Sequence, residues 1–167
     1  MREFVPSDDG SELRVAVVAA QWNESIVRRL LDGALATLRT RGVADDDVRV
    51  YWVPGSFELP RAAAWAFSQE YPWIDHPHTR RSCEVVIALG CIIRGETEHF
   101  RLVADAASQG LAHVALDHRR PVLNGVLAVE NAAQAEARSG GEHGNAGSQA
   151  ALAAIRMANL GRGRFAS

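Results

Sequence analysis

The sequence predicts an α/β fold, a three-layer sandwich in which helices cover both faces of a four-stranded, mainly parallel sheet. Four short apolar runs have the length of buried strands, and a segment with helical spacing follows each of them. Strands buried on both faces read as continuous apolar runs, which is typical of parallel sheets. At 167 residues, the chain is most simply one domain.

The expected strands are Leu13–Ala19, Val48–Val53, Glu84–Gly90 and Pro121–Val129. The first helix should span Ser25–Arg41, since leucine and alanine recur on one face and Gly42 follows as a stop. Asn23 or Ser25 would cap it. A second helix should follow Pro54–Glu58, with a proline in its first turn, where a missing N–H costs little.

In the second half, helices are expected over Thr97–Ala112, Ala132–Arg138 and Ala146–Leu160, with the glycine-rich Ser139–Gly147 as a flexible connector. Tyr71–Ser82, with its prolines, histidines and arginines, reads as a surface loop. The single domain would cover residues 1–167, with loose termini at 1–11 and 162–167. So small a sheet in an alanine- and valine-rich chain favours oligomerisation, which would cover apolar surface.

Composition excludes several classes of partner. A net charge of −2 with both signs dispersed argues against nucleic acid and anionic membranes, which leaves small molecules. No apolar stretch approaches the ~18 residues of a membrane span, and Met1–Gly10 lacks the apolar core of a signal peptide, so we expect a cytoplasmic protein. Cys83 and Cys91 flank one strand, too far apart for a disulfide, and should be reduced thiols.

Polar and aromatic residues gather where the predicted strands end, and ligands bind beyond the carboxyl ends of strands in open parallel sheets. Gln21–Asn23 follows the first strand, Gly55–Glu58 the second and Cys91–His99 the third. Trp22 offers a flat face for a planar heterocycle, the alternative being an ordinary core aromatic. These three clusters predict a small-molecule site at one edge of the sheet.

The third cluster sets a lone histidine at the start of a helix. Glu96 to Glu98 would supply a helix cap and an acidic first turn, and the free N–H groups and dipole of a helix amino end attract anions, so Gly95–Thr97 would bind a phosphate. The same dipole favours a neutral imidazole at His99, which could accept a proton near pH 7. The alternative for His99 is a cap or a satisfied polar residue.

Other reaction centres have less support. His76 and His78 lie in the predicted surface loop without further ligands at useful spacing, so we predict no metal. Gly140–Gly147 lacks the lysine and hydroxyl of a phosphate loop, and Arg138 just before it is a better anion contact. No GxGxxG follows Gly90, which argues against a dinucleotide, and no Ser-His-Asp triad can be assigned.

Two longer motifs occur in order, Pro-Gly-Ser-Phe-Glu at 54–58 and Ile-Arg-Gly-x-Thr-x-His-Phe at 93–100. Shorter ones are Trp22-Asn23, Gly125-Val126-Leu127, Gln134-Ala135 with Arg138, and Gly144-Asn145-Ala146-Gly147. Together they resemble the lumazine synthase family, over most of the chain. The resemblance implies a flavodoxin-like sheet flanked by helices and homopentamers with active sites between neighbouring subunits, which in some members stack into decamers or icosahedral shells.

The resemblance also implies a transferase of riboflavin biosynthesis, acting at the penultimate step. It would condense 5-amino-6-(D-ribitylamino)uracil with 3,4-dihydroxy-2-butanone 4-phosphate to give 6,7-dimethyl-8-ribityllumazine, phosphate and water, without metal or organic cofactor. His99 would transfer protons and Arg138 would hold the phosphate. The substrate contacts implied are Trp22, Asn23, Gly55, Ser56, Phe57, Glu58, Cys91, Ile92, Ile93, Gly95, Glu96, Thr97, Asn124 and Arg138.

Four positions depart from the commoner family pattern. Asn124 stands where an aromatic residue of the neighbouring subunit usually covers the heterocycle, and Trp22 replaces a phenylalanine. Ala146 occupies a usual lysine position and Gln149 a usually acidic one. These changes resemble a second bacterial type of lumazine synthase that favours decamers. They leave two alternatives, a catalytically weak riboflavin- or lumazine-binding protein of the same fold and a mainly structural shell protein.

Overall fold

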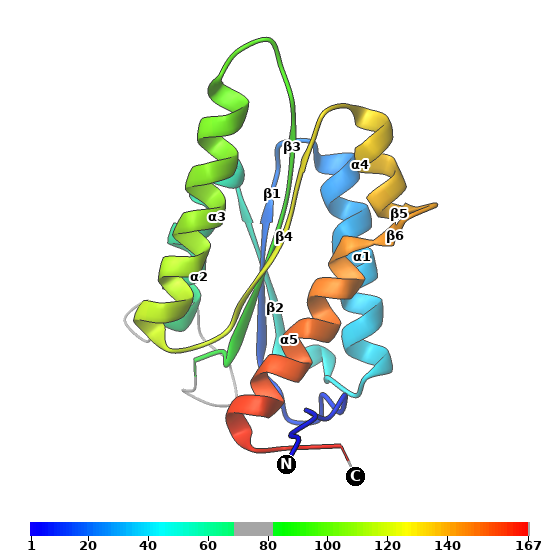
Figure 1. The fold of residues 1–167 in the computed structure, drawn as a ribbon, viewed down its shortest axis with the longest axis vertical. Coiled ribbons are helices and arrows are strands. Elements are labelled where there is room, and N and C mark those ends of the chain that lie inside the picture. Colours follow the sequence, from blue (N-terminus) through cyan, green and yellow to red (C-terminus); the bar gives the residue numbers. More distant parts are fainter. Residues whose placement is uncertain (69–81, 167) are drawn as a thin grey trace.

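The chain folds into a parallel sheet with helices on both faces, in a computed structural model that describes residues 1–68 and 82–166 (Figure 1). The strand order is β2-β1-β3-β4. The strands are β1 (Val15–Ala20), β2 (Val48–Val53), β3 (Val85–Ile93) and β4 (Val122–Val129). All three strand pairings are parallel, which confirms the predicted α/β class. The predicted surface loop Tyr71–Ser82, with His76 and His78, lies outside the described residues except for Ser82.

The helices form two layers. They are α1 (Glu24–Thr40), α2 (Leu59–Phe67), α3 (His99–His118), α4 (Ala132–Arg138) and α5 (Ala146–Arg162). Figure 1 shows α2 and α3 on one side of the sheet and α1, α4 and α5 on the other. Among the described residues, no helix combines the length and the apolar character needed to cross a membrane.

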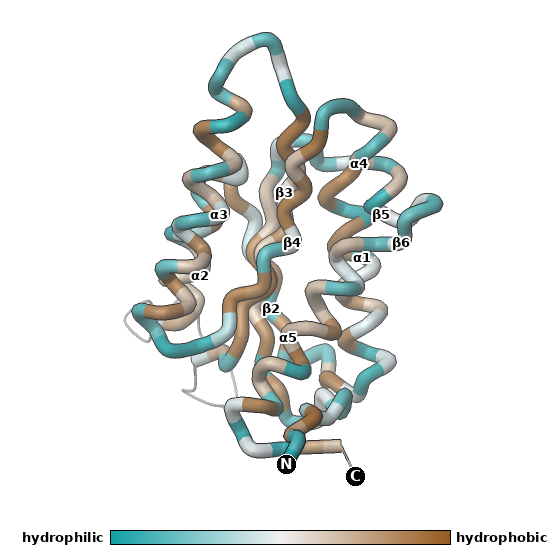
Figure 2. Tube along the Cα trace, viewed as in Figure 1, coloured by the Kyte–Doolittle hydropathy of each residue, from teal (hydrophilic) through white to brown (hydrophobic). Residues whose placement is uncertain are grey.

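The sheet divides the core in two, as its pleat requires. Val15, Val17 and Ala19 of β1 point into a cluster shared with α1 and α5, whereas Ala16 and Val18 point into a cluster shared with α2. Every residue of β1 is buried, because this strand is paired on both edges and covered on both faces. Figure 2 shows the resulting hydrophobic colouring along the strands, with hydrophilic residues at the loops. Continuous burial explains why the central strands β1 and β3 read as apolar runs.

Close backbone packing joins α1 to α5. A Cβ atom at Gly147 would overlap the carbonyl oxygen of Leu30 and would lie 2.6 Å from its carbonyl carbon. Asn145, just before α5, accepts a hydrogen bond from Ser148 N (3.0 Å) and donates one to Arg29 O (2.8 Å). This asparagine therefore caps α5 and fixes it to the middle of α1 at the same time.

Three segments differ from the prediction by more than two residues at one end or in kind. β3 continues past Gly90 to Ile93, because residues 91–93 pair with the end of β4. Helix α3 begins at His99 rather than Thr97 and continues to His118, so Glu96 and Thr97 lie in the loop before it, and no acidic side chain occupies its first turn. The expected flexible connector is instead an antiparallel hairpin of β5 (Ser139–Gly141) and β6 (Gly144–Asn145). Its glycines carry no apolar alternation that would have revealed strands.

The two termini, which we expected to be loose, contact each other beside α5. The rings of Phe4 and Phe165 are 5.1 Å apart, and Ser7 N donates to Arg164 O (3.1 Å). Asn159 of α5 is fully buried and donates to the carbonyl oxygens of residues 7 and 9. Both ends thus lie at the amino end of the sheet, opposite the edge where the predicted site clusters meet (Figure 1).

Candidate active site

A pocket of about 590 Å³ opens at the carboxyl edge of the sheet. The three sequence clusters supply most of its wall, as the strand order predicts. Its lining residues are Trp22, Gly55, Ser56, Phe57, Glu58, Cys91, Ile92, Ile93, Gly95, Thr97, His99, Phe100 and Val103. Eleven of these belong to the contacts predicted from the sequence, so segments far apart along the chain do converge on one site.

Hydrogen bonds hold the clusters against each other. Gln21 N donates to Val53 O (2.8 Å) and Trp22 N to Pro54 O (3.2 Å), which joins the first cluster to the second. The side-chain amide of Asn23 donates to Cys91 O (2.8 Å), which joins the first cluster to the third. Asn23 itself does not line the pocket. Within this chain, its side chain instead fixes the segment after β1 to the end of β3.

The second cluster turns sharply between β2 and α2. Residues 56–58 form one turn of 3₁₀ helix, followed by Leu59 and Pro60 in the first turn of α2. Phe57 is 61% exposed at the rim, whereas Ser56 is only 5% exposed. Within the described residues, the Ser56 hydroxyl makes no hydrogen bond to protein, and it is not one of the buried unpartnered atoms, so it is free to bond to a ligand or water in the pocket.

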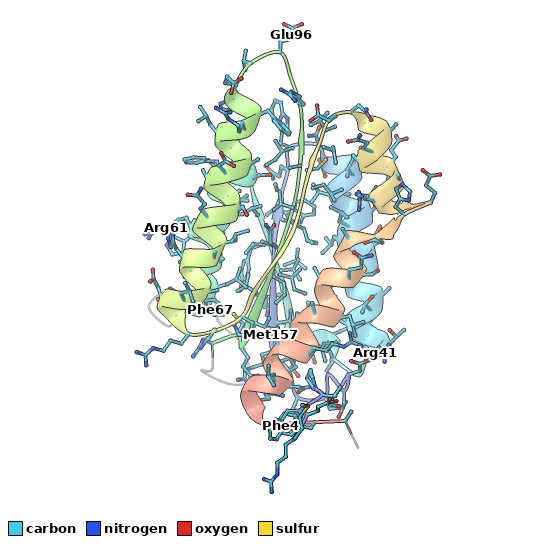
Figure 3. All side chains as sticks on the ribbon, viewed as in Figure 1. Phe4, Arg41, Arg61, Phe67, Glu96 and Met157 are labelled. Atoms are coloured by element: carbon cyan, nitrogen blue, oxygen red, sulfur yellow. The ribbon has the colours of Figure 1, made fainter. Side chains whose placement is uncertain are left out.

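The third cluster places His99 as the first residue of α3, a 20-residue helix. The imidazole lies in the pocket wall beside Thr97, next to the amino end of the helix and its N–H groups. Glu96 is exposed at the tip of the β3–α3 loop and points away from the body of the protein (Figure 3). Thr97 and the first residue of α3 therefore line the pocket, whereas the Glu96 carboxylate does not.

Asn124 and Arg138 also lie away from this pocket. Asn124 is exposed on the edge strand β4, five residues before its end, or about 16 Å along the strand. Its amide is used locally, since Oδ1 accepts from Val126 N (3.0 Å). Arg138 is the exposed last residue of α4 and makes no salt bridge to any described residue. A single chain does not bring these two residues to His99.

Phe100 and Val103 line the pocket but were absent from the predicted contacts. Val103 is explained by the start of α3, because a residue four positions after His99 lies on the same helix face, and Phe100 is simply the residue next to His99. The helical spacing of residues 99 and 103 was the available signal.

A larger cleft, about 800 Å³, lies at the opposite end of the sheet, between the carboxyl ends of α3 and α5. Its polar wall contains Arg14, Glu84 and Arg120, which already pair with protein groups. Its apolar wall includes Met157, labelled in Figure 3. No group of three metal-ligating side chains occurs among the described residues. We therefore assign the site to the smaller pocket, where unpartnered groups converge.

Comparison with known proteins shows the family of this chain. A family model described as 6,7-dimethyl-8-ribityllumazine synthase matches residues 12–162. The chain belongs to the 6,7-dimethyl-8-ribityllumazine synthase family. Proteins of that name from Pediococcus pentosaceus and Porphyromonas gingivalis are 39% and 40% identical over 160 residues, which cover 96% of this chain and 96% and 91% of theirs. One from Stenotrophomonas maltophilia is 46% identical over 147 residues, 88% of each chain.

The two cysteines of this lumazine synthase family member are buried free thiols. Burial raises the pKa of the Cys83 thiol to about 12 and that of the Cys91 thiol to about 11. In the unfolded chain, both should ionise near pH 8.5. As the pH rises above that value, the unfolded chain releases protons that the folded chain keeps, so the folded state loses stability.

We expect the free energy of unfolding to fall between pH 8 and pH 10, by up to about 2 kcal/mol for each thiol. Urea denaturation at several pH values measures it. The sequence contains no lysine, so few other groups titrate in this range. The double variant Cys83→Ala/Cys91→Ala is the control, and an equally steep loss of stability in that variant would contradict the assignment to the thiols.

Proposed function

We propose that this chain condenses 5-amino-6-(D-ribitylamino)uracil with 3,4-dihydroxy-2-butanone 4-phosphate to form 6,7-dimethyl-8-ribityllumazine, the penultimate step of riboflavin biosynthesis. The observation that supports this best is the meeting of Trp22, Ser56 and His99 in one pocket at the carboxyl edge of the sheet. The family match over residues 12–162 and the names of the relatives support the same reaction.

The reaction requires that the two substrates be oriented and that protons be transferred. The uracil amine and the butanone carbonyl form an imine and release water, phosphate is eliminated, and ring closure by the ribitylamino nitrogen releases a second water. Each step moves protons, and none requires electrons from outside. Holding both substrates in one pocket supplies the proximity, and a side chain that accepts and returns a proton supplies the rest.

The heterocycle would lie between Trp22 and the end of β3. The Trp22 side chain is 73% exposed and lines the pocket, so a ring face is open for stacking. Cys91 to Ile93 would border the pyrimidine. The hydroxyl of Ser56 and the carboxylate of Glu58 would bind the ribityl hydroxyls, since both lie in the wall formed by the second cluster.

The phosphate of the butanone would bind at the other end of the pocket. The amino end of α3, with Gly95 and the Thr97 hydroxyl, offers donors and a favourable dipole for an anion. His99 stands in the same wall. We therefore assign His99 the proton transfers of imine formation and phosphate elimination.

A second copy of the chain would complete the site. Asn124 and Arg138 are exposed and lie off the pocket of their own chain, as residues that serve a neighbouring site would. Exposed apolar side chains at or near the pocket, Trp22, Phe57 and Leu102, would be covered by such contact. We propose a homo-oligomer with sites between subunits, a pentamer or decamer on the family resemblance. Sedimentation at several concentrations measures it, and a monomer throughout would exclude this arrangement.

Arg138→Ala is expected to raise the KM for the butanone phosphate about tenfold, because a guanidinium–phosphate hydrogen bond is charge-assisted and contributes more than a neutral one. The KM for the ribitylaminouracil should change less than twofold. Steady-state kinetics with each substrate varied in turn measure both constants. Arg39→Ala, at the far end of α1, is the matched control. An equal rise for both substrates would assign Arg138 a structural role instead.

The proposed reaction is tested by mixing purified protein with both substrates and following lumazine fluorescence above the uncatalysed background. A protein-dependent rise in rate supports the enzyme. No rise, together with tight riboflavin binding by titration, would replace it with a binding protein of the same fold.

We also propose that the protein works in the cytoplasm, where buried cysteines remain reduced. Cell fractionation with an antibody against the chain tests this, and recovery outside the cytoplasmic fraction would contradict it.

A further inference from the structure

Gly90 lies in β3 directly before the residues that border the pocket. Alternate residues of the strand face alternate sides, and Val86 and Ala88 face the cluster shared with α2. Position 90 therefore faces the same side, toward the turn that carries Ser56. A Cβ atom there would lie 2.6 Å from Ser56 Oγ and 3.2 Å from a methyl group of Leu59. Real side chains do not approach so closely, so any residue larger than glycine must displace the hydroxyl.

We propose that Gly90 is a positioning residue for substrate binding, because its missing side chain lets the Ser56 hydroxyl lie against β3 in the pocket wall. The hydroxyl is otherwise unusual. It belongs to a side chain that is 5% exposed, lines the pocket and makes no hydrogen bond within the described residues. A hydroxyl that lines the pocket without a protein partner is available to a polyol.

The inference rests on the proposed function, in which Ser56 binds the ribityl chain, and extends it to a residue that does not touch substrate. Only one of the two substrates carries the ribityl chain. A residue that acts through Ser56 must therefore affect the two KM values differently, whereas a residue that merely supports the sheet would affect them alike or not at all.

The test is a double-mutant cycle with the full-length protein. Gly90→Ala and Ser56→Ala are each expected to raise the KM for the ribitylaminouracil about five- to tenfold, with less than a twofold change for the butanone phosphate. Because Ser56→Ala removes the atom that the new methyl group would meet, the double variant should match Ser56→Ala alone. Multiplied effects in the double variant would overturn the inference.

Gly125→Ala is the matched control in the next strand. Its Cβ atom would lie 2.7 Å from a methyl group of Leu89, in the core rather than at Ser56. It should lower the thermal midpoint without a selective rise in either KM. The same selective rise for Gly125→Ala would show that strain in the sheet, and not Ser56, determines the effect.

If Gly90→Ala does not fold, Gly90→Ala/Ser56→Gly relieves the contact and should restore both folding and the KM of Ser56→Gly. Failure of that variant to fold would overturn the inference, since the clash would then lie elsewhere.

An inactive wild type would reject the proposed function and this inference together. An active wild type with unchanged kinetics in Gly90→Ala would reject this inference alone.

Discussion

Gly147→Ala is expected to lower the free energy of unfolding by about 3 kcal/mol, the largest loss of stability that we predict for one methyl group. The methyl group would overlap the carbonyl group of Leu30. A side-chain neighbour could rotate away, but a carbonyl in the middle of α1 can move only if the helices separate. Both helices cover the same half of the core, so that separation would expose apolar surface. Urea denaturation at fixed protomer concentration measures the change.

Gly161→Ala is the matched control for this prediction. It lies on the same helix, and a Cβ atom there would meet nothing within 4 Å. Alanine has the higher helix propensity, so this variant should be neutral or slightly more stable, by less than about 1 kcal/mol. A loss below 1 kcal/mol for Gly147→Ala would mean that α1 and α5 adjust more easily than their backbone contact indicates.

His99→Ala is expected to lower kcat about 100-fold while changing either KM less than threefold. A general acid–base group contributes mainly in the transition state, and removing one typically costs two or more powers of ten. Single-turnover fluorescence isolates the chemical step from product release. The uncatalysed condensation must be subtracted, because it sets the lowest rate that the assay can resolve.

His113→Ala provides the control for the loss of an imidazole from α3. His113 is exposed on the same helix, about 21 Å further along its axis, and lies outside the pocket wall. It should retain the wild-type kcat. An unchanged kcat in His99→Ala would remove His99 from proton transfer and leave proximity as the source of catalysis.

Much of the fold could be predicted because the two central strands, β1 and β3, are buried apolar runs. The errors have local causes. Gly90 looked like the end of a strand, yet β3 continues because residues 91–93 find partners in β4. The last turns of α3 were missed although Leu111 and Val114 keep the helical spacing toward the core. The β5–β6 hairpin is specified by glycines alone.

The candidate site could be predicted to the extent that it lies within one chain. Trp22, the Gly55–Glu58 turn and His99 meet because parallel strands end at one edge, which the order of elements implies. Asn124 could be named only through the family resemblance, and Arg138 was otherwise singled out only as an anion contact, since no pattern within one sequence says which residues would serve a neighbouring copy. The role that we propose for Gly90 could not be predicted for another reason. The sequence shows the glycine but not the Ser56 hydroxyl that lies against it.

The positions of the two thiols make local opening of the protein measurable. Cys83 belongs to the half of the core under α2, whereas Cys91 belongs to the half under α1 and α5. With substrate in the pocket, a thiol reagent can react with each only when its own layer opens, so the two labelling rates then measure two separate opening equilibria. Mass spectrometry of partly labelled protein would then rank the two layers by stability. Because Cys91 also lines the pocket, bound substrate should slow its labelling and leave that of Cys83 unchanged.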